Sequence, residues 1–201
     1  MPLLVSRLQR VTNSMTMLNN ISTWPALRWP WFLIAGSALT LELAALYFQY
    51  GMGLEPCVMC IYQRTAVTAL IFAPIPALIS PRSVVLRTLS LVLCLLAIIW
   101  GAQIAFEHVQ MQNPENFMLL LSCDVIPNFP EWLQLHTLIP SIFEARGTCG
   151  DIDWSFLGLS MPQWMTVIFV VYLLAISVVY LIRLVKTKTI EYSSVSATTQ
   201  Y

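Results

Sequence analysis

Residues 84–105 read VVLRTLSLVLCLLAIIWGAQIA, a nearly uninterrupted apolar run with a single charge, Arg87, near its start. About 20 apolar residues in a helix are enough to cross the hydrocarbon core of a bilayer. The run lacks the alternation of a barrel strand, and a helix satisfies its own backbone hydrogen bonds in lipid. The stretch therefore predicts a transmembrane helix.

Three further runs have the same character, although one contains Glu42 and another contains Pro74 and Pro76. These runs cover residues 31–50, 65–79 and 164–184. Of the 201 residues, 58% are hydrophobic and 10% are charged, whereas charged residues make up roughly 25% of soluble proteins. This composition excludes an ordinary soluble domain. We predict an all-α membrane protein, folded as a bundle of four transmembrane helices.

Basic residues predict the orientation of these helices. Four spans place both termini (1–30 and 186–201) and the short 80–83 connection on one side of the membrane. That side holds Arg7, Arg10, Arg28, Arg82, Arg87, Arg183, Lys186 and Lys188. The other side holds only Arg64 and Arg146, together with most of the acids. The positive-inside rule therefore predicts cytoplasmic termini and outer loops at 51–64 and 106–162.

The outer loops contain four of the five cysteines. Cys57-Val-Met-Cys60 in the first loop is a Cys-x-x-Cys pair, the smallest unit that opens and closes a disulfide reversibly. The second loop carries Cys123 and Cys149. The fifth cysteine, Cys94, lies within a span, where a free cysteine is expected to be a small packing residue.

Three interpretations of the loop cysteines compete. Two structural disulfides would suit an oxidising compartment, but a Cys-x-x-Cys loop gains little stability from closure. A structural zinc site usually shows two closely spaced pairs, and this chain has only one, so we predict no metal ligands. The third interpretation, which we favour, is a pair of redox-active disulfides that exchange electrons.

The residues around Cys60 support this interpretation. If a helix begins near Cys57, just after the restricted Pro56, then Cys60 lies in its first turn, where the helix dipole stabilises a thiolate. Arg64 is four residues later on the same face and can stabilise the same charge. Arg64 is equally compatible with an interfacial role, in which its side chain extends toward lipid head groups.

Other polar residues near the membrane are weaker candidates. His108 follows the third run at the outer interface, with Gln112 one turn later, and its level matches that of Arg64. Glu42 lies at mid-membrane, where a charged acid costs about 2.5–3.5 kcal/mol on insertion scales. We therefore expect Glu42 to face the bundle and to be paired or protonated.

The second outer loop contains an apolar segment that runs from Trp132 to Phe143 and is punctuated by Pro130 and Pro140. This pattern predicts a short amphipathic helix. Such a helix can lie in the membrane interface or pack as an ordinary loop helix.

The stretch EPCVMCIYQR, from Glu55 to Arg64, resembles the bacterial disulfide bond formation protein B (DsbB) family. The resemblance continues through LELAALYFQ at 41–49, Glu107-His108, Cys123-Asp124, FPEW at 129–132 and FLGLSMPQW at 156–164. It covers about residues 30–185. One departure is Gln63, where the family often has an acid.

This resemblance implies a quinone-dependent protein-disulfide oxidoreductase of the bacterial inner membrane, with its cysteine loops in the periplasm. Such an enzyme reoxidises a DsbA-like partner of thioredoxin fold and passes the electrons to ubiquinone or menaquinone. DsbA is a strong oxidant, at about −120 mV, so its reoxidation requires a still stronger final acceptor.

The resemblance also implies roles for single residues. The partner's thiolate would attack Cys123, and Cys149 would then engage Cys57. Cys60 would be left as a thiolate against the quinone, with Arg64 stabilising its charge. The quinone site would also include His108 and Gln112. The alternative function from a different class is a non-catalytic membrane scaffold with structural disulfides, which should resist reduction by a glutathione-like pool.

Overall fold

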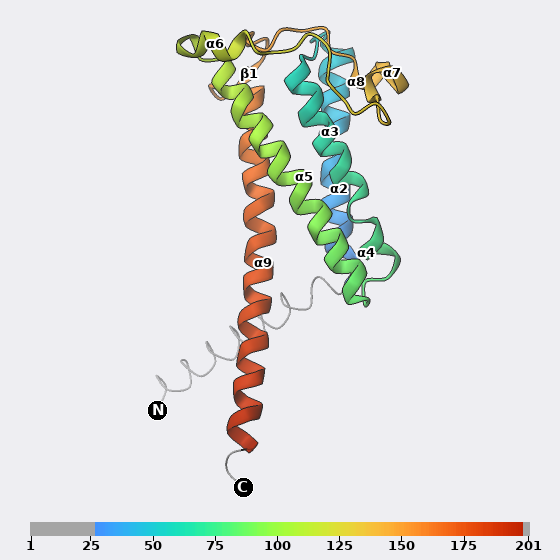
Figure 1. Ribbon diagram of the computed structural model, residues 1–201, viewed down its shortest axis with the longest axis vertical. Helices are drawn as coiled ribbons and strands as arrows, with labels where there is room; N and C mark the ends of the chain where they lie inside the picture. The colour runs from blue at the N-terminus through green and yellow to red at the C-terminus, as the bar shows by residue number, and fades with distance from the viewer. Residues whose placement is uncertain (1–26, 199–201) are drawn as a thin grey trace.

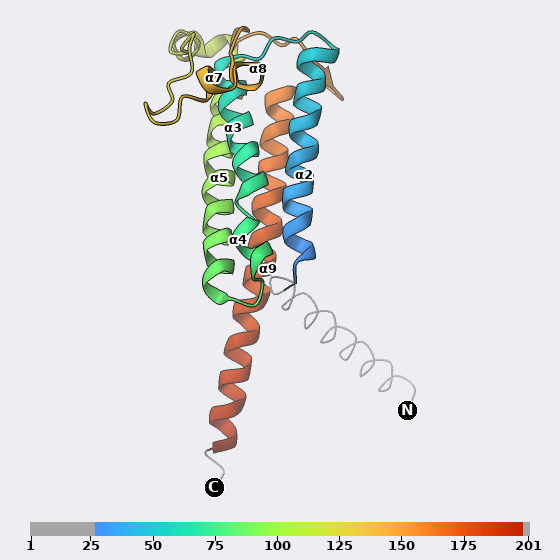
Figure 2. The ribbon, with the colours of Figure 1, turned by 90° about the vertical axis from the view of Figure 1, so that its right-hand side faces the viewer.

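The computed structural model describes residues 27–198 of the chain. Within this part, four helical segments are long and apolar enough to cross a membrane, and they stand side by side as a bundle (Figure 1, Figure 2). The segments are Trp29–Gly51, Val58–Ile79, Val84–Met111 and Met161–Leu181. The predicted four-helix membrane fold is therefore confirmed. Residues 1–26 of the predicted N-terminal segment lie outside the described part.

The elements follow one another in a simple order along the chain. They are α2 (Trp29–Leu46), a π-helical turn (Tyr47–Gly51), α3 (Val58–Phe72), α4 (Ile75–Ile79), α5 (Val84–Met111), a 3-10 turn (Pro114–Asn116), α6 (Phe117–Leu120), α7 (Leu135–Leu138), α8 (Pro140–Phe143), β1 (Ser155–Phe156), β2 (Leu159–Ser160) and α9 (Met161–Thr198). The loops around α6, α7, α8 and β1 gather at the end of the bundle opposite the C-terminus, and the short connection from α4 to α5 lies at the other end (Figure 1).

The second span is longer than predicted and is broken near its end. It begins at Val58 rather than at residue 65, so the predicted outer loop 51–64 is shorter in the structure. Because Gln63 and Arg64 are polar, the sequence pattern did not include them in the span, yet both side chains are buried in the bundle. The break between α3 and α4 falls at Pro74, since proline cannot continue the helical hydrogen bonds.

A buried serine compensates for this break. The backbone N–H of Ala77, in the first turn of α4, lacks a partner within its own helix. It donates to Oγ of Ser90 on α5 at 2.9 Å, in the interior of the bundle. In lipid no water could replace this bond, and the contact therefore allows a proline break at membrane depth.

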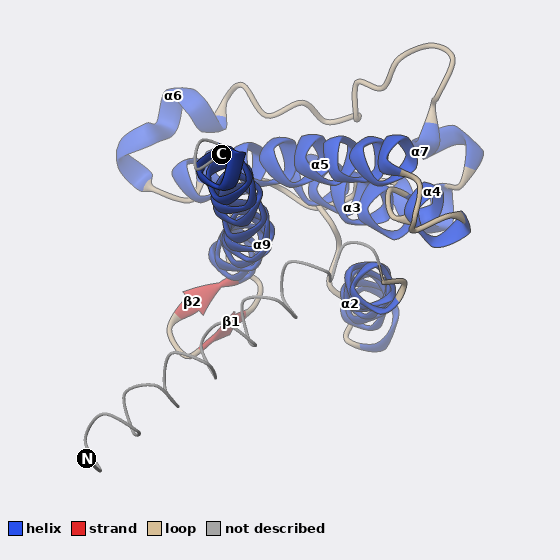
Figure 3. Ribbon diagram, turned by 90° about the horizontal axis from the view of Figure 1, so that it is seen from below, coloured by secondary structure: helices blue, strands red, loops and turns tan. Residues whose placement is uncertain are grey.

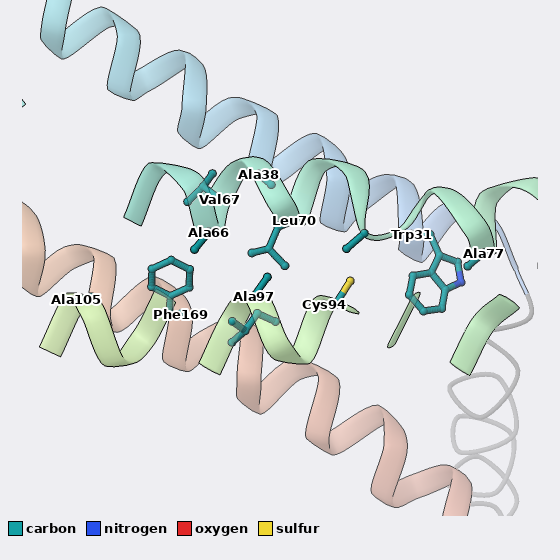
Figure 4. Packing of buried hydrophobic residues seen from close by; sticks show 12 residues of the cluster. Trp31, Ala38, Ala66, Val67, Leu70, Ala77, Cys94, Ala97, Ala105 and Phe169 are labelled. Carbon is teal, nitrogen blue, oxygen red and sulfur yellow. The ribbon is translucent and has the colours of Figure 1, made fainter. Parts of the chain in front are cut away.

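The core of the bundle depends on close approach between helices (Figure 4). A Cβ atom on Gly101 of α5 would collide with the ring of Phe169 on α9 and would meet Cβ of Ala66 on α3 at 3.0 Å. Small residues allow such approach, and packing of this kind holds membrane helices together. The pair Ser37 Oγ and Tyr172 OH, 2.6 Å apart, joins α2 to α9.

The second outer loop runs from α6 to α7 along the α5 side of the bundle (Figure 3). The predicted amphipathic helix is present as two short helices, α7 and α8, instead of one. Ile139 separates them with a non-helical conformation (φ −136°, ψ 68°), because proline at 140 disfavours a helical residue before it. Phe143 is buried, whereas Trp132 and Leu138 are exposed.

Candidate active site

The four loop cysteines lie in one cluster at the loop end of the bundle. Cys57 and Cys149 are buried members of this cluster, and Cys60 and Cys123 pack against them. Cys123 and Cys149 form a disulfide, while Cys57 and Cys60 are unbonded. Residues separated by up to 92 positions in the sequence are thus gathered in one cluster, as thiol–disulfide exchange between the two pairs would require.

The N-terminus of α3 positions the Cys57–Cys60 pair. Cys57 is the N-cap residue, with an extended backbone, and its sulfur accepts a hydrogen bond from the backbone N–H of Cys60 at 3.2 Å. The two Sγ atoms lie 2.8 Å apart. Cys60 therefore occupies the first turn of a helix, as the sequence predicts, where the dipole favours negative charge.

The two sulfurs of this pair are not equivalent. The pKa of the Cys57 thiol lies far above its ordinary value, first because of its hydrogen bond with Cys60 and second because of burial. The raised pKa favours the protonated form of Cys57 in the reduced pair. Of the two side chains, Cys60 is the more accessible, so the geometry presents Cys60 as the reactive sulfur.

Direct backbone contacts hold the two outer loops together. The N–H groups of Arg146 and Gly147 both donate to the carbonyl oxygen of Pro56, at 2.9 and 3.1 Å. A Cβ atom on Gly147 would collide with the carbonyl oxygen of Glu55. Only glycine allows this close approach without a backbone shift, and it brings the segment leading to Cys149 against the segment leading to Cys57.

His108 links the two cysteine pairs. Its Nε2 lies 3.5 Å from Sγ of Cys57 and 3.2 Å from the carbonyl oxygen of Cys149. Its Nδ1 lies 3.1 Å from Nε2 of Gln63. Because an amide NH₂ group only donates, Nδ1 accepts, and the proton resides on Nε2 and points toward the other two groups. His108 lies in the last turn of α5, not after the third span as predicted, because that helix continues to Met111.

Arg64 is a buried residue and does not extend toward lipid head groups. Its Nη1 donates to Oε1 of Gln49 at 2.7 Å and to the carbonyl oxygen of Ile142 at 2.5 Å. It also interacts electrostatically with Cys60, one turn earlier on α3. One guanidinium therefore joins the π-helical turn after α2, α3 and the end of α8 beside the Cys60 sulfur.

Glu42 is the buried counterion of Arg64. Its Oε1 lies 3.4 Å from Nε of Arg64, and the two side chains are 9% and 6% exposed. The sequence predicted that Glu42 faces the bundle and is paired or protonated, and the structure places it in the bundle beside this partner. The ion pair lets a carboxylate and a guanidinium occupy the interior together.

Gln112 and Tyr62 attach the second outer loop to the helices. Gln112 donates to the carbonyl oxygen of Asp151 at 3.2 Å and accepts from Oγ of Ser160 at 2.7 Å. Tyr62 OH accepts from the backbone N–H of Asn128 at 2.7 Å. Gln112 thus fixes the segment that follows Cys149, and Tyr62 fixes the segment that follows Cys123.

A cavity of about 300 Å³ opens beside Cys60. Its walls are mostly apolar and come from α2 and the π-helical turn after it, α3, the end of α5, α9 and the loop before β1. The lining side chains include Leu41, Phe48, Cys57, Cys60, Gln63, Arg64, Val67, His108, Gln112, Asp153, Trp154, Trp164 and Met165. The predicted residues Cys57, Cys60, Arg64, His108 and Gln112 all border this cavity, whereas Cys123 and Cys149 do not.

Several residues at the site were not predicted from the sequence to have a role there, although Gln63 was noted as a departure from the family. Gln49 and Gln63 position Arg64 and His108, and Trp154 forms part of the cavity wall, with its ring 5.0 Å from that of Phe48. Gln49 and Gln63 stand within the stretches that carry the family resemblance. Trp154 gave no signal, because a tryptophan between two spans is equally typical of an interface.

Comparison with known proteins places these features in a family. Residues 27–179 match the family model of disulfide bond formation protein DsbB. The disulfide bond formation protein B of Pseudoalteromonas atlantica is 42% identical over 88% of this chain and 100% of the relative. That of Haemophilus influenzae is 43% identical over 86% of this chain and 96% of the relative. That of Shewanella amazonensis is 49% identical over 74% of this chain and 86% of the relative.

Proposed function

The chain belongs to the disulfide bond formation protein B family, and we propose that it is a quinone-dependent thiol oxidase of the bacterial inner membrane. In this proposal it reoxidises a periplasmic DsbA-like dithiol oxidase and passes two electrons to ubiquinone or menaquinone. The distribution of basic residues supports a topology in which both termini are cytoplasmic and the cysteine loops face the periplasm.

One observation carries this proposal: two cysteine pairs share a cluster, and one of the pairs borders an apolar cavity. A structural disulfide needs no second pair beside it and no cavity. A relay needs both, because one pair must meet a soluble partner and the other must meet an acceptor in the membrane. Cys123 lies at the loop surface, and Cys60 lies at the cavity.

The first steps are thiol–disulfide exchanges. A partner thiolate attacks Sγ of Cys123, breaking the Cys123–Cys149 bond and releasing Cys149 as a thiolate. The thiolate of Cys149 then attacks Cys57 in an oxidised Cys57–Cys60 pair and releases Cys60 as a thiolate. The hydrogen bonds from Arg146 and Gly147 to the carbonyl oxygen of Pro56 hold the segment of Cys149, which attacks, against the segment of Cys57, which is attacked.

The next exchanges restore the outer pair. The partner's second thiolate attacks the mixed disulfide, which forms the partner's own disulfide and releases Cys123 as a thiolate. Cys123 then attacks Cys149 in the Cys57–Cys149 disulfide, which restores the Cys123–Cys149 bond and releases Cys57. At this point two electrons and two protons have moved from the partner to the Cys57–Cys60 pair. Since the Cys57 pKa is raised, one of the two protons is held at Cys57.

The cavity fits a quinone in shape and chemistry. Apolar and aromatic walls such as Phe48 and Trp154 suit a flat ring, and a membrane-level cavity suits a lipid-soluble molecule. Polar groups of Arg64, His108 and Gln112 border the same space and can face the carbonyl oxygens. A bound quinone supplies an acceptor for two electrons and two protons.

The chain's own residues prepare Cys60 for this transfer. Arg64, held by Gln49 and Glu42, places a positive charge near the Cys60 sulfur and stabilises its thiolate. His108 holds its Nε2 proton near Sγ of Cys57. This proton can be transferred to the Cys57 thiolate when that sulfur leaves the Cys57–Cys149 disulfide. Burial of both groups excludes water that would weaken these interactions.

The test is an anaerobic reaction of the purified, quinone-loaded protein with a reduced DsbA-like partner. Quinone absorbance and partner thiols are followed together, in the unmodified protein, in Cys60→Ser and in the matched control Cys94→Ser. We expect one quinone reduced for each two partner thiols lost in the unmodified protein and in Cys94→Ser. In Cys60→Ser no quinone should be reduced, and thiol loss should stop at the two equivalents that reduce the Cys123–Cys149 disulfide. A scaffold with structural disulfides would leave quinone and thiols unchanged in all three proteins.

A further inference from the structure

Three side chains that take part in the proposed electron transfer also form a set of donor atoms that suits a metal ion. Sγ of Cys57, Sγ of Cys60 and a ring nitrogen of His108 all lie within 4.8 Å of one another. We propose that the reduced Cys57–Cys60 pair and His108 bind a thiophilic divalent cation such as Zn²⁺, and that the bound cation locks the pair in its reduced state. This revises the prediction, made from the sequence, that the chain has no metal ligands.

The spacing of these atoms suits a tetrahedral ion. Zinc binds sulfur at about 2.3 Å and imidazole nitrogen at about 2.0–2.1 Å, so neighbouring ligand atoms are roughly 3.5–3.8 Å apart. The distance from Sγ of Cys57 to Nε2 of His108 is 3.5 Å and already fits. The Cys57–Cys60 distance of 2.8 Å must open by about 1 Å. Cys60 has space for this rotation because its side chain borders the cavity.

Two cysteines and one histidine form a donor set that leaves one coordination position open. Zinc sites of this kind accept water or a small ligand in the fourth position. The cavity beside Cys60 provides the space for that ligand. The site therefore corresponds to an open zinc site, whereas the four-cysteine site considered for the sequence is ruled out in this state by the Cys123–Cys149 disulfide.

Charge in this buried region also favours the cation. Two thiolates and one Zn²⁺ sum to zero, so metal binding displaces the thiol protons without leaving a net buried charge. The carboxylate of Asp153 interacts with Cys60 and adds negative potential. Arg64 opposes a cation at this place, but its charge also stabilises the thiolate form of Cys60 that binds the metal.

His108 can present a lone pair to the metal after a small change around it. Metal binding through Nε2 requires its proton to move to Nδ1. Gln63, 3.1 Å from Nδ1, can then turn its amide so that Oε1 accepts this proton. A histidine ligand held through its second nitrogen by such an acceptor is the usual arrangement around zinc.

The proposed site exists only in the reduced state. In a Cys57–Cys60 disulfide the sulfurs are about 2.05 Å apart and carry no thiolate charge. Metal binding and oxidation of the pair therefore exclude each other. Binding itself is independent of the proposed electron transfer, while the resulting inhibition of turnover rests on the proposed function.

The direct test uses Co²⁺ and Zn²⁺ as probes of the full chain in detergent. Protein reduced with a phosphine, and then freed of it, is titrated with Co²⁺ under anaerobic conditions while thiolate-to-metal charge-transfer absorption is recorded. We expect about one equivalent of Co²⁺ to bind, Zn²⁺ to displace it, and the band to be lost after oxidation. Because the readout is metal binding, it remains informative even if the protein reduces no quinone.

Variants identify the ligands. His108→Ala should weaken binding at least about tenfold, and Cys60→Ser should abolish the band. His108→Cys supplies another ligand atom and should restore binding, which a merely structural role of His108 would not explain. The band should persist in Cys94→Ser and in the double variant Cys123→Ser/Cys149→Ser. Failure of reduced protein to bind Co²⁺, binding that is unchanged in His108→Ala, or binding that is lost in the Cys123/Cys149 double variant would overturn the proposal.

Discussion

Nε of Arg64 lies 3.4 Å from a carboxylate oxygen of Glu42 in the interior of the helix bundle. The pair joins α3 to α2 and leaves Nη1 of Arg64 free to donate to Ile142 at the end of α8. A single buried ion pair thus connects the membrane helices with the outer loop that carries Cys149. It also fixes the charge that faces Cys60.

Removal of Glu42 is expected to be costly. Glu42→Ala would leave the guanidinium of Arg64 buried without its counterion, and breaking a buried pair in this way costs about 3–5 kcal/mol. Thermal and denaturant unfolding of the purified protein in detergent measures this loss. The double variant Glu42→Leu/Arg64→Met should recover most of the stability but not the activity. Equal stability of Glu42→Ala and the unmodified protein would show that the pair is not a structural element.

Gly147 should control exchange between the two cysteine pairs. Gly147→Ala places a Cβ against the carbonyl of Glu55 and pushes the two outer loops apart. A displacement of about 1 Å between reacting groups can cost on the order of 100-fold in rate. We expect turnover with a reduced partner to fall roughly 10–100-fold while quinone binding is retained.

Gly150→Ala is the matched control for this variant, because its Cβ would meet only side-chain atoms of Leu120, which can move. Its turnover should stay close to that of the unmodified protein. If the two variants behave alike, the close approach of the loops does not limit exchange.

Alkylation should distinguish the two sulfurs of the Cys57–Cys60 pair. Since the Cys57 pKa is raised, Cys57 stays protonated at pH values where an ordinary cysteine, with a pKa of about 8.5, ionises. We expect iodoacetamide to modify Cys60 first, and Cys57 only at higher pH. In Cys60→Ala the main cause of the shift is gone, so the pH profile of Cys57 should move to lower pH. Peptide mass mapping measures both profiles, and faster labelling of Cys57 than of Cys60 at neutral pH would contradict the assignment.

Gly101 should be intolerant of larger residues. Gly101→Val would press against Phe169 and Ala66, and overpacking of this kind costs about 1–3 kcal/mol. Gly36→Val is the matched helical control, since nothing lies within 4 Å of a Cβ there. Unfolding midpoints in detergent should fall for Gly101→Val alone. Equal midpoints for the two variants would mean that this helix contact is looser than the structure shows.

The fold could be predicted because its dominant signal is local. Long apolar runs specify membrane helices one segment at a time, and the four spans are found near their predicted positions. The predicted boundary of the second span was wrong because polar side chains there form hydrogen bonds with residues far away in the sequence. Because of the polar residues Gln63 and Arg64, the second span was predicted to begin only at residue 65, yet their partners lie on α5, on the π-helical turn after α2 and on α8.

The site was predictable only in part, for a related reason. The Cys-x-x-Cys spacing and Arg64 are local, and their placement at the start of a helix follows from the sequence. The proximity of His108 to both cysteine pairs depends on how α5 packs against α3, and the contact of Gly147 with the first loop depends on tertiary structure. The partner of Glu42 could not be named for the same reason.

The most direct measurement of the proposed relay is rapid acid quenching during turnover with a reduced DsbA-like partner, followed by mass mapping of every disulfide. We expect a transient partner–Cys123 disulfide and a transient Cys57–Cys149 disulfide, both appearing before quinone is fully reduced. Reduction of quinone without any Cys57–Cys149 disulfide at any time, under conditions where the partner–Cys123 disulfide is trapped, would contradict it.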